Sequence, residues 1–245
     1  MNRLEITRFP ALDYACNEAM NTLCTNLSYC GDDVRTVLFT SRYEQEGKSS
    51  IVMNVMRTLA GLGKRVVLVD ADLRRSSLAR RYRFQYAQRQ NYGLAQYLAG
   101  MCPLESAVYE TNLPNAYLLP AGREVFSSLQ LLASPWYGRM MEQLRRQFDV
   151  VLVDTPPAGV IVDAIEVAKY CDGAIIVVSY NTGRKQEVGE VVDNLRKTGC
   201  RVLGAVMNGV DLGSFRNRKY YYRSGRYASY YAKNEREAEG RPAKK

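Results

Sequence analysis

The feature that most constrains the fold of this chain is a series of six apolar, β-branched segments of strand length. They cover residues 34–40, 65–70, 116–120, 149–154, 173–179 and 201–208. The segments are continuously apolar and do not alternate with polar residues, which is typical of strands buried on both faces of a sheet. Such a sheet needs helices on both sides, and the sequence therefore predicts an α/β fold.

Helical patterns separate most of these strands, at 48–63, 135–147, 162–170 and 186–199. Alternating strands and helices predict a doubly wound, mostly parallel sheet flanked by helices, with right-handed crossovers. We expect a single domain with a flexible C-terminal tail. Its expected parts are an N-terminal helical segment at 1–33, the main domain at 34–212 and a basic, Tyr-rich tail at 213–245.

Composition excludes several kinds of chemistry. The chain has no His, so His-based acid–base catalysis, Ser/His/Asp or Cys/His nucleophiles and His-ligated metals are ruled out. Its six Cys form no CxxC pair, which argues against a zinc ribbon or a thioredoxin-type centre and fits a reducing compartment. The sequence lacks an apolar leader and an apolar run long enough for a membrane span, and we expect a cytoplasmic location.

The positive charge is concentrated in the tail. The whole chain carries a formal charge of +9, and residues 213–245 hold ten basic and three acidic residues, a balance of +7. The rest of the chain is close to neutral. A basic tail favours an exposed arm that meets an acidic partner, and we expect no nucleic-acid partner.

A phosphate-binding loop is predicted at residues 40–50, TSRYEQEGKSS, between a strand and an apolar helix. Gly47, Lys48 and Ser49 match the end of the GxxxxGK[ST] pattern, whereas Arg42 stands in place of its first Gly. In such a loop Lys48 reaches the β- and γ-phosphates and the Ser49 hydroxyl ligates Mg²⁺. The alternative is a helix N-terminus that merely carries these residues. The predicted nucleotide-binding residues of the loop are Glu46, Gly47, Lys48, Ser49 and Ser50.

Carboxylates follow two of the buried strands. Asp70 and Asp72 end one strand, and Asp154 ends another. Parallel strands deliver such side chains to the carboxyl edge of the sheet, where ligands bind. Each Asp taken singly has the alternative role of a helix N-cap. Together with the loop they predict a nucleotide site that uses ATP and Mg²⁺.

These three motifs together resemble the deviant P-loop ATPase superfamily, which includes septum-site and plasmid-partition ATPases and bacterial tyrosine kinases (BY-kinases). The segment VVLVDADLRRS at 66–76, with Arg74 after its second Asp, is similar to the BY-kinase Walker A′ box. Ser76 replaces a Pro of the family, a departure that we expect to be minor. The resemblance covers about residues 12–231 and implies a P-loop NTPase fold. It also implies an ATP-dependent, autophosphorylating protein-tyrosine kinase of the cytoplasmic, capsular and exopolysaccharide-biosynthesis type.

The resemblance implies roles for the site residues. Lys48, Asp70 and Asp72 are the expected catalytic residues, and Ser49, Asp70 and Asp154 are the expected metal ligands. Either Asp70 or Asp72 orients or deprotonates the incoming tyrosine hydroxyl, and the sequence leaves the choice open. Asn208 matches the family's contact with the adenine edge, and a turn residue is its alternative role.

Six tyrosines cluster in the tail. The family resemblance implies that they are autophosphorylation sites presented to a neighbouring subunit: Tyr220, Tyr221, Tyr222, Tyr227, Tyr230 and Tyr231. The alternative is an adhesive Tyr-rich arm for a partner or a stacked base.

The family also implies partners. We expect a separate membrane-spanning activator of the polysaccharide co-polymerase type, which holds the kinase at the inner face of the plasma membrane. A role in regulating capsular or exopolysaccharide synthesis and export follows. The family's ring of subunits is in doubt, because Glu18 is kept but Asn21 and Cys24 replace two arginines that pair across subunits.

Two other functions remain open from sequence: a partition-type ATPase, and a non-catalytic adaptor of the export machinery. The loop supports the second because Glu44 and Gln45 replace Pro-Gly, and Gln45 costs about 1 kcal/mol if its φ is positive. Whether Arg75, Arg80 and Arg81 contact phosphates or only solvate a helix face is equally open.

Overall fold

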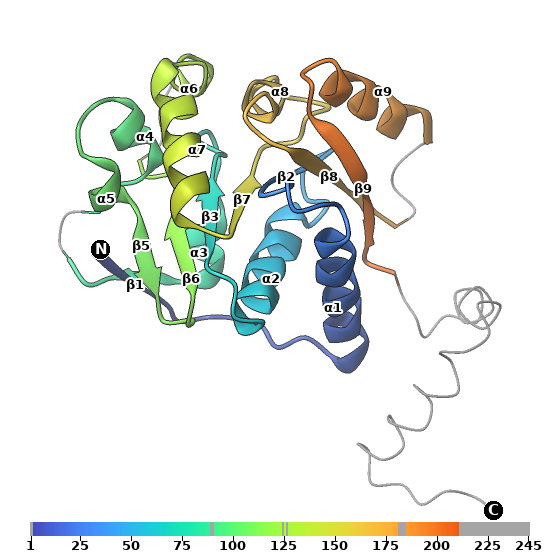
Figure 1. Ribbon diagram of the computed structural model, residues 1–245, viewed down its shortest axis with the longest axis horizontal. Helices are drawn as coiled ribbons and strands as arrows, with labels where there is room; N and C mark the ends of the chain where they lie inside the picture. Colours follow the sequence, from blue (N-terminus) through green and yellow to red (C-terminus); the bar gives the residue numbers. More distant parts are fainter. Residues whose placement is uncertain (1, 89–90, 124, 126, 181–184, 211–245) are drawn as a thin grey trace, which may run out of the picture. The chain divides into compact units, whose positions relative to one another are not determined.

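A computed structural model describes residues 2–88, 91–123, 125, 127–180 and 185–210. The strands in this part of the chain form one sheet in the order β4-β1-β5-β6-β3-β7-β2-β8-β9 (Figure 1). The strands are β1 (Asn2–Ile6), β2 (Thr36–Ser41), β3 (Val66–Asp70), β4 (Phe84–Tyr86), β5 (Tyr109–Thr111), β6 (Ala116–Leu119), β7 (Val150–Asp154), β8 (Gly173–Ser179) and β9 (Arg201–Asn208). The helices are α1 (Tyr14–Ser28), α2 (Lys48–Gly61), α3 (Leu78–Tyr82), α4 (Leu94–Leu98), α5 (Leu104–Ala107), α6 (Ser128–Leu132), α7 (Pro135–Gln147), α8 (Asp163–Ala168) and α9 (Lys185–Arg196).

The sheet is mostly parallel, as expected. Strands β6, β3, β7, β2, β8 and β9 all run in the same direction, and only the β1–β4 and β5–β6 pairs are antiparallel. All six predicted strands are present, as β2, β3, β6, β7, β8 and β9. The sequence did not predict β1, β4 and β5, which are short and lie toward one edge of the sheet.

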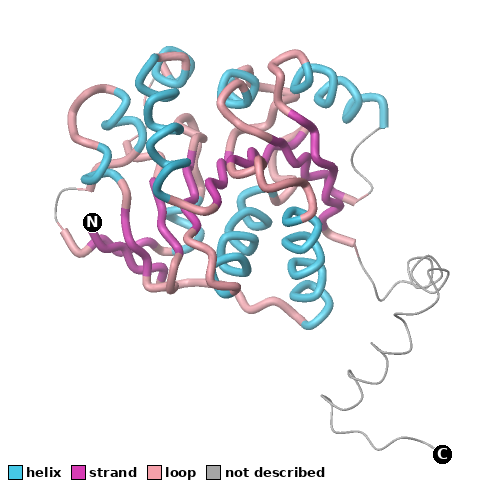
Figure 2. The backbone as a smooth tube through the Cα atoms, viewed as in Figure 1, coloured by secondary structure: helices cyan, strands magenta, loops and turns pink. Residues whose placement is uncertain are grey.

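Helices cover both faces of the sheet, and each face has its own hydrophobic core (Figure 2). Val37, Phe39 and Leu68 belong to the core under α1, α2 and α3. Their sequence neighbours Leu38, Val67 and Val69 belong to the core under α4 to α9. Because successive strand residues point to opposite faces, a strand with helices on both sides must be apolar at every position. This explains the continuous apolar runs in the sequence.

The strand order positions the site. Strand β7 lies between β3 and β2, although β2 and β3 are joined in the chain through α2. The carboxyl ends of β2, β3 and β7 therefore meet at one edge of the sheet, beside the N-terminus of α2. Ligands of open α/β sheets bind at such a point, where the strand order reverses.

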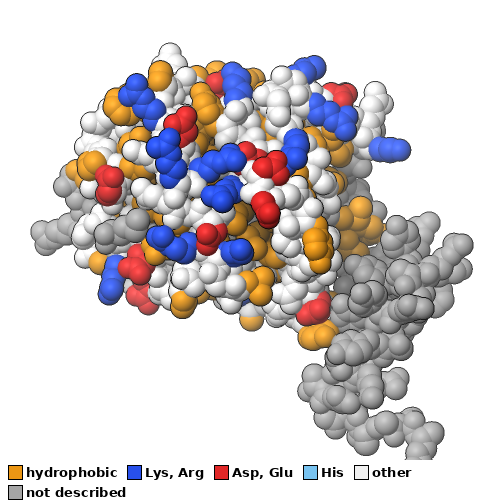
Figure 3. Space-filling model, viewed as in Figure 1, with side chains coloured by type: hydrophobic (Ala, Val, Ile, Leu, Met, Phe, Trp, Pro, Cys, Tyr) orange, Lys and Arg blue, Asp and Glu red, His pale blue; other side chains and the backbone are white. Residues whose placement is uncertain are grey.

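The N-terminal segment contains a strand as well as the expected helix. Strand β1 enters the sheet between β4 and β5, with Leu4 and Ile6 buried and their neighbours partly or fully exposed. On the face viewed in Figure 3, basic and acidic side chains are intermingled. In the described residues no helix is both long and apolar enough to span a membrane.

Candidate active site

The loop between β2 and α2 has the backbone geometry of an anion site. Gly47 precedes α2 with a φ of 87°, and a Cβ atom there would lie 2.0 Å from Nδ2 of Asn208. The first N–H groups of a helix have no acceptor within the helix, and they favour an anion. The φ of Gln45 is 62°, which confirms that a non-glycine residue occupies the left-handed region in this loop. Glycine at position 47 is thus required by both backbone conformation and space.

Glu46 and Asn208 hold this loop in place. The Glu46 side chain is buried, and its carboxylate accepts hydrogen bonds from the N–H groups of Tyr43 at 2.8 Å and Ser179 at 3.1 Å. Asn208 Nδ2 donates to the Glu46 carbonyl at 3.0 Å. Both side chains are thus engaged with the protein, and their predicted contact with a nucleotide stays a prediction.

Asp70 and Asp154 end the adjacent strands β3 and β7 and lie opposite each other in register. Both are buried, with exposed fractions of 2% and 1%. The N–H of Ala71 donates to the Asp154 carbonyl at 2.8 Å, so the backbone hydrogen bonds between β3 and β7 extend one residue beyond Asp70. The two predicted carboxylates are therefore brought together by strand pairing alone.

Burial disfavours the charge on both groups. It raises the pKa of Asp70 well above its ordinary value, with the Asp154 charge adding to the effect and a hydrogen bond from Ser76 opposing it. Burial also raises the pKa of Asp154 to about 6, although the Lys48 charge and a Ser49 hydrogen bond lower it. A cation placed here would favour the ionised form of both carboxyls.

Asp72 differs from these two because it lines the cavity beside the loop. It is half-buried, and its Oδ1 accepts from the N–H of Arg75 at 3.0 Å. The Asp72 N–H lies 3.4 Å from Asp70 Oδ1, a long hydrogen bond that links the two groups. Asp72 is thus the one of the pair that an incoming hydroxyl can approach.

The residues fit a magnesium ion. Among the described residues, the buried Oδ1 of Asp154 has no hydrogen-bond partner, and Ser49 lies within hydrogen-bond reach of this carboxyl. The described residues contain no group of three or more His, Cys, Asp or Glu that could hold a metal alone. Mg²⁺ typically takes one or two carboxylates together with substrate phosphates and water. Ser49 and Asp154 would supply two protein ligands, and the remaining ligands would come from phosphate and water.

A cavity of about 1270 Å³ adjoins the loop. Of the predicted site residues, those that line it are Gly47, Lys48, Ser49, Ser50 and Asp72. The lining also includes five arginines, namely Arg8, Arg74, Arg75, Arg80 and Arg81. The structure thus places the phosphate loop and an arginine-rich wall around one space.

Ser76, a departure that we expected to be minor, has a definite role in the site. Its hydroxyl donates a short hydrogen bond to Oδ2 of Asp70. The Pro that the family carries at this position has no group able to donate that bond. No periodicity or motif identifies Ser76 as a partner of Asp70, because the contact depends on how the chain turns after β3.

Arg74 forms an ion pair that sequence reasoning missed. Its Nε and Nη2 donate to the two oxygens of the buried Asp163 at 2.9 and 3.1 Å. The Ser128 hydroxyl donates to the same carboxylate at 2.6 Å. Asp163 begins α8 and Ser128 begins α6, so this pair joins the loop after β3 to two helices.

Arg42, which replaces the first Gly of the loop pattern, binds the segment after β7. Its Nη1 donates to the Gly159 carbonyl, and its Nη2 lies 3.8 Å from the Glu190 carboxylate. A Cβ atom on Gly159 would lie 2.2 Å from Arg42 Nη1. The side chain therefore ties the beginning of the phosphate loop to its neighbour instead of entering the cavity.

The α1 positions that replace family arginines do not present charge. Cys24 is buried, with an exposed fraction of 2%, and belongs to the core. Asn21 Nδ2 donates to Glu18 Oε1 at 3.1 Å on the same helix. The expectation that the usual pairing between subunits is altered stays a prediction. The six predicted tail tyrosines lie outside the described residues.

The comparisons with known proteins agree with the geometry. Residues 44–199 match the AAA domain family. Tyrosine-protein kinase CpsD of Streptococcus pneumoniae is 32% identical over 195 residues, which are 80% of this chain and 85% of that protein.

Solved structures share the fold. The kinase domain of the Escherichia coli tyrosine kinase ETK superposes with a TM-score of 0.76 at 24% identity, covering 83% of this chain and 81% of that one. The septum site-determining protein MinD of Pyrococcus horikoshii, solved with Mg-ADP, has a TM-score of 0.61 at 26% identity, covering 71% and 70%. The fold is thus a nucleotide-binding P-loop fold. From the domain match and the kinase relative together, the chain belongs to the AAA domain family and, within it, to the bacterial tyrosine-protein kinases.

Proposed function

We propose that the chain is an ATP- and Mg²⁺-dependent protein-tyrosine kinase that phosphorylates tyrosines in its own C-terminal segment. The observation that carries the proposal is the meeting of Lys48 and Ser49 with Asp154, whose buried Oδ1 has no partner among the described residues. A buried carboxylate oxygen without a hydrogen-bond partner, beside a phosphate loop, is well placed to bind the metal ion of a metal–nucleotide complex.

The chain's residues divide the work of phosphoryl transfer. Lys48 and the backbone N–H groups of residues 46–49 neutralise phosphate charge as the transferred group moves. Ser49 and Asp154 hold Mg²⁺, which supplies charge neutralisation on the phosphate oxygens when it is bound. Asp70 lies beside Asp154 on the adjacent strand, and its charge adds to the negative potential that attracts the metal ion. Most of the catalysis in such a transfer is positioning and electrostatics, so the absence of His is no obstacle.

Asp72 is the better candidate for the group that receives the tyrosine proton. It lines the cavity, whereas Asp70 is buried behind it and is engaged by Ser76. As Asp72 accepts the proton, the tyrosine oxygen bonds to the γ-phosphorus and the bond to the β–γ bridging oxygen breaks. The products are phosphotyrosine and ADP.

The finer biological role rests on the family resemblance. We propose that a separate membrane-spanning protein of the polysaccharide co-polymerase type activates the kinase at the inner face of the plasma membrane. The regulated process is then capsular or exopolysaccharide synthesis and export. The buried Cys24 and the Glu18–Asn21 bond support an assembly that differs from the family's usual ring.

The test is ATP-dependent phosphotyrosine on the purified full chain, alone and with the cytoplasmic tail of a candidate activator. Lys48→Met should lower the rate at least about a hundredfold, because it removes a charge that acts on the transferred phosphoryl group. Lys64→Met removes a charge from an exposed turn after α2 and should change little. A chain ending at residue 215 should also lose the signal.

Other outcomes separate the alternatives. ATP binding without phosphotyrosine, under every activator condition, would favour the adaptor or the partition-type ATPase. ATP-dependent sedimentation with anionic liposomes or with DNA would then select the partition-type ATPase.

A further inference from the structure

Four arginines line the cavity together with the phosphate loop: Arg8, Arg75, Arg80 and Arg81. We call this set the arginine rim. Arg80 and Arg81 lie on α3, which is anchored because Leu78 and Tyr82 are buried at exposed fractions of 0% and 1%. Fixed in this way, the helix holds its basic side at the cavity.

The rim lies beside the reacting groups. Arg81 Nη1 donates to Ser50 Oγ at 2.5 Å, one residue after the predicted metal ligand Ser49. Arg75 adjoins Asp72, since its N–H donates to Asp72 Oδ1 at 3.0 Å. A group bound by the rim would therefore lie close to the place where a tyrosine hydroxyl meets the γ-phosphate.

The charge of the rim is not balanced by ion pairs. Within the part of the chain that the structure describes, none of its four arginines has a carboxylate within 4.0 Å, whereas the neighbouring Arg74 is paired with Asp163. Glu44 and Asp72 are the acidic residues that line the cavity in this part of the chain. Several guanidinium groups around one cavity attract a multivalent anion, and they bind phosphate oxygens especially well because the planar fork matches them.

The tyrosine-rich segment carries groups of opposite charge to the arginine rim only after phosphorylation. Residues 213–245 carry a balance of +7, the same sign as the rim, so the unmodified segment is repelled. Each phosphotyrosine adds about −1.5 to −2 charges and three strong acceptor oxygens. With six tyrosines between residues 220 and 231, a phosphate on one tyrosine can be held while another tyrosine is at the site.

We propose that the arginine rim binds phosphotyrosine in the 220–231 segment of a second copy of this chain. The proposal rests on the proposed function, because phosphotyrosine must first be made there. Retention of the product at the acceptor side makes each phosphorylation promote the next. The first phosphate on a segment is then added slowly and the following ones faster.

Binding of synthetic peptides tests the rim without any catalysis. The probes are peptides of residues 216–233 with and without a phosphate on Tyr227, added to the dephosphorylated full chain without ATP. The phosphopeptide should bind at least about tenfold more tightly, and the preference should weaken as salt is raised. Arg75→Gln with Arg80→Gln should abolish the preference.

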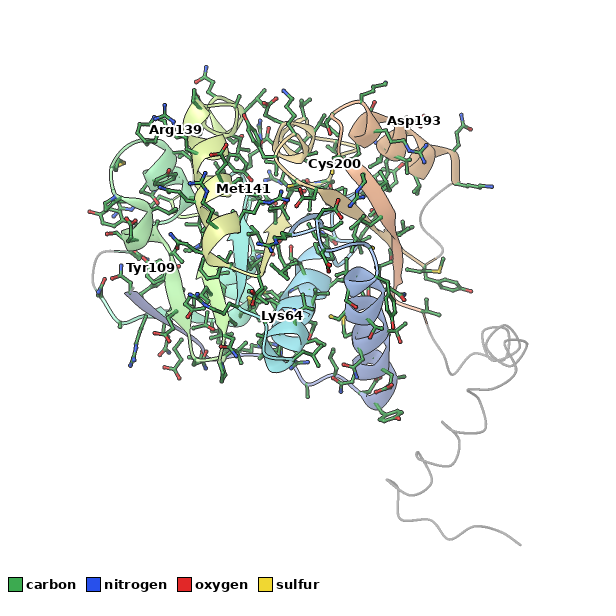
Figure 4. All side chains as sticks on the ribbon, in the orientation of Figure 1. Lys64, Tyr109, Arg139, Met141, Asp193 and Cys200 are labelled. Atoms are coloured by element: carbon green, nitrogen blue, oxygen red, sulfur yellow. The ribbon has the colours of Figure 1, made fainter. Side chains whose placement is uncertain are left out.

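A matched control removes two charges elsewhere. Lys64→Gln with Arg139→Gln changes the net charge by the same amount, and both residues are exposed and lie outside the cavity lining (Figure 4). This control should keep the preference. Equal binding by the two double variants would overturn the proposal, because the effect would then be one of overall charge.

Two further measurements separate the rim from the nucleotide site. Mg-ADP should leave phosphopeptide binding unchanged if the peptide is on the rim, whereas displacement by Mg-ADP would place it in the phosphate loop and refute the proposal. In the kinase assay, the Arg75/Arg80 double variant should keep the KM for ATP. It should add the first phosphate at least as fast, because the rim repels the unmodified segment, but it should lose the acceleration of the later phosphorylations. An increased KM for ATP would assign the rim to the nucleotide instead. Because the peptide assay uses no ATP, it is informative even if the chain has no kinase activity.

Discussion

Two buried carboxylates at either end of the β7–α8 connection have opposite surroundings. Asp163, with an exposed fraction of 0%, accepts three hydrogen bonds, two from Arg74 and one from Ser128. Asp154, at 1%, has an oxygen without a partner among the described residues, and its pKa is raised to about 6. Residue type and burial are the same, so only the partners differ.

The two carboxylates therefore suit different roles, Asp163 in holding the structure together and Asp154 in binding a ligand. A fully paired carboxylate such as Asp163 fixes neighbouring segments and has little capacity left for a ligand. An incompletely paired one such as Asp154 costs free energy when no cation is bound, and a cation can recover that free energy on binding. Four variants test this contrast.

Removing the partner of Asp163 should have the largest effect. Arg74→Ala leaves a buried carboxylate with only the Ser128 hydrogen bond, and because the Arg74 side chain is 43% exposed we expect the free energy of unfolding to fall by about 3 kcal/mol. Urea denaturation at pH 7.5 measures the loss. The neighbouring Arg75→Ala should change stability by less than about 0.5 kcal/mol, because that side chain is exposed. Similar losses in both variants would mean that the ion pair is not what holds this region.

Neutralising Asp154 should have the opposite sign. The folded-state pKa of about 6 lies above the ordinary value of 3.8, so ionisation disfavours the folded state by up to about 3 kcal/mol. Asp154→Asn should therefore stabilise the nucleotide-free protein in a chelating buffer by up to that amount. The penalty is fully present above the folded pKa and disappears as the pH falls through about 6 toward 4.

Thermal or urea unfolding at pH 8 and pH 4.5 checks this sign. The gain from Asp154→Asn should be large at the higher pH and small at the lower one, while phosphotransfer is lost at both. Asp193→Asn, an exposed position on α9 that is labelled in Figure 4, is the control and should change little. A destabilised Asp154→Asn variant at pH 8 would show that the carboxylate is well paired after all.

Ser76→Ala tests how a single hydrogen-bond partner affects Asp70, the buried carboxyl on the neighbouring strand β3. It removes the hydrogen bond to Asp70, should lower stability by about 1 kcal/mol, and should raise the pKa of Asp70 further, because that bond favours its ionised form. Carboxyl titration by NMR measures the second effect. Ser77→Ala is the matched control, since the Ser77 side chain makes no capping bond at α3. An unchanged pKa of Asp70 in Ser76→Ala would show that the Ser76 hydroxyl does not act on Asp70.

Gln45→Gly should have the smallest effect on stability. It relieves about 1 kcal/mol of left-handed strain at a φ of 62°, partly offset by the greater freedom of Gly in the unfolded chain. We expect a net gain of about 0.5 kcal/mol and tighter ATP binding in an ATP titration. Glu44→Gln, which changes only the charge beside Gln45, separates the electrostatic contribution. Unaltered ATP affinity in Gln45→Gly would show that the left-handed conformation of residue 45 does not affect ATP binding.

Much of the fold could be predicted because its central strands are long and apolar on both faces. Each of β2, β3, β6, β7, β8 and β9 was recognisable from composition and length. Strands β4 and β5 have three residues each, too few for any period to stand out. Strand β1 was hidden within a segment expected to be helical, because its place in the sheet depends on distant partners in β4 and β5.

The residues of the candidate site were named from the sequence, and their roles stay predictions; the structure adds the contacts around them. The positions of Gly47, Lys48, Ser49, Asp70 and Asp154 followed from motifs at strand ends, and strand pairing brings the two carboxylates together. The Ser76–Asp70 bond and the Arg74–Asp163 pair join residues that carry no mutual signal in the sequence.

The sequence by itself determined the class of fold, the phosphate loop and the carboxylates beside it, because those features depend on residue order within a few turns or strands. Only the tertiary structure decided which buried carboxylate is paired and which is not. It also decided that Cys24 is in the core, that Asn208 holds the phosphate loop and that five arginines line one cavity. The physical reason is that hydrogen-bond partners and burial belong to contacts between segments far apart in the chain, which local patterns do not specify.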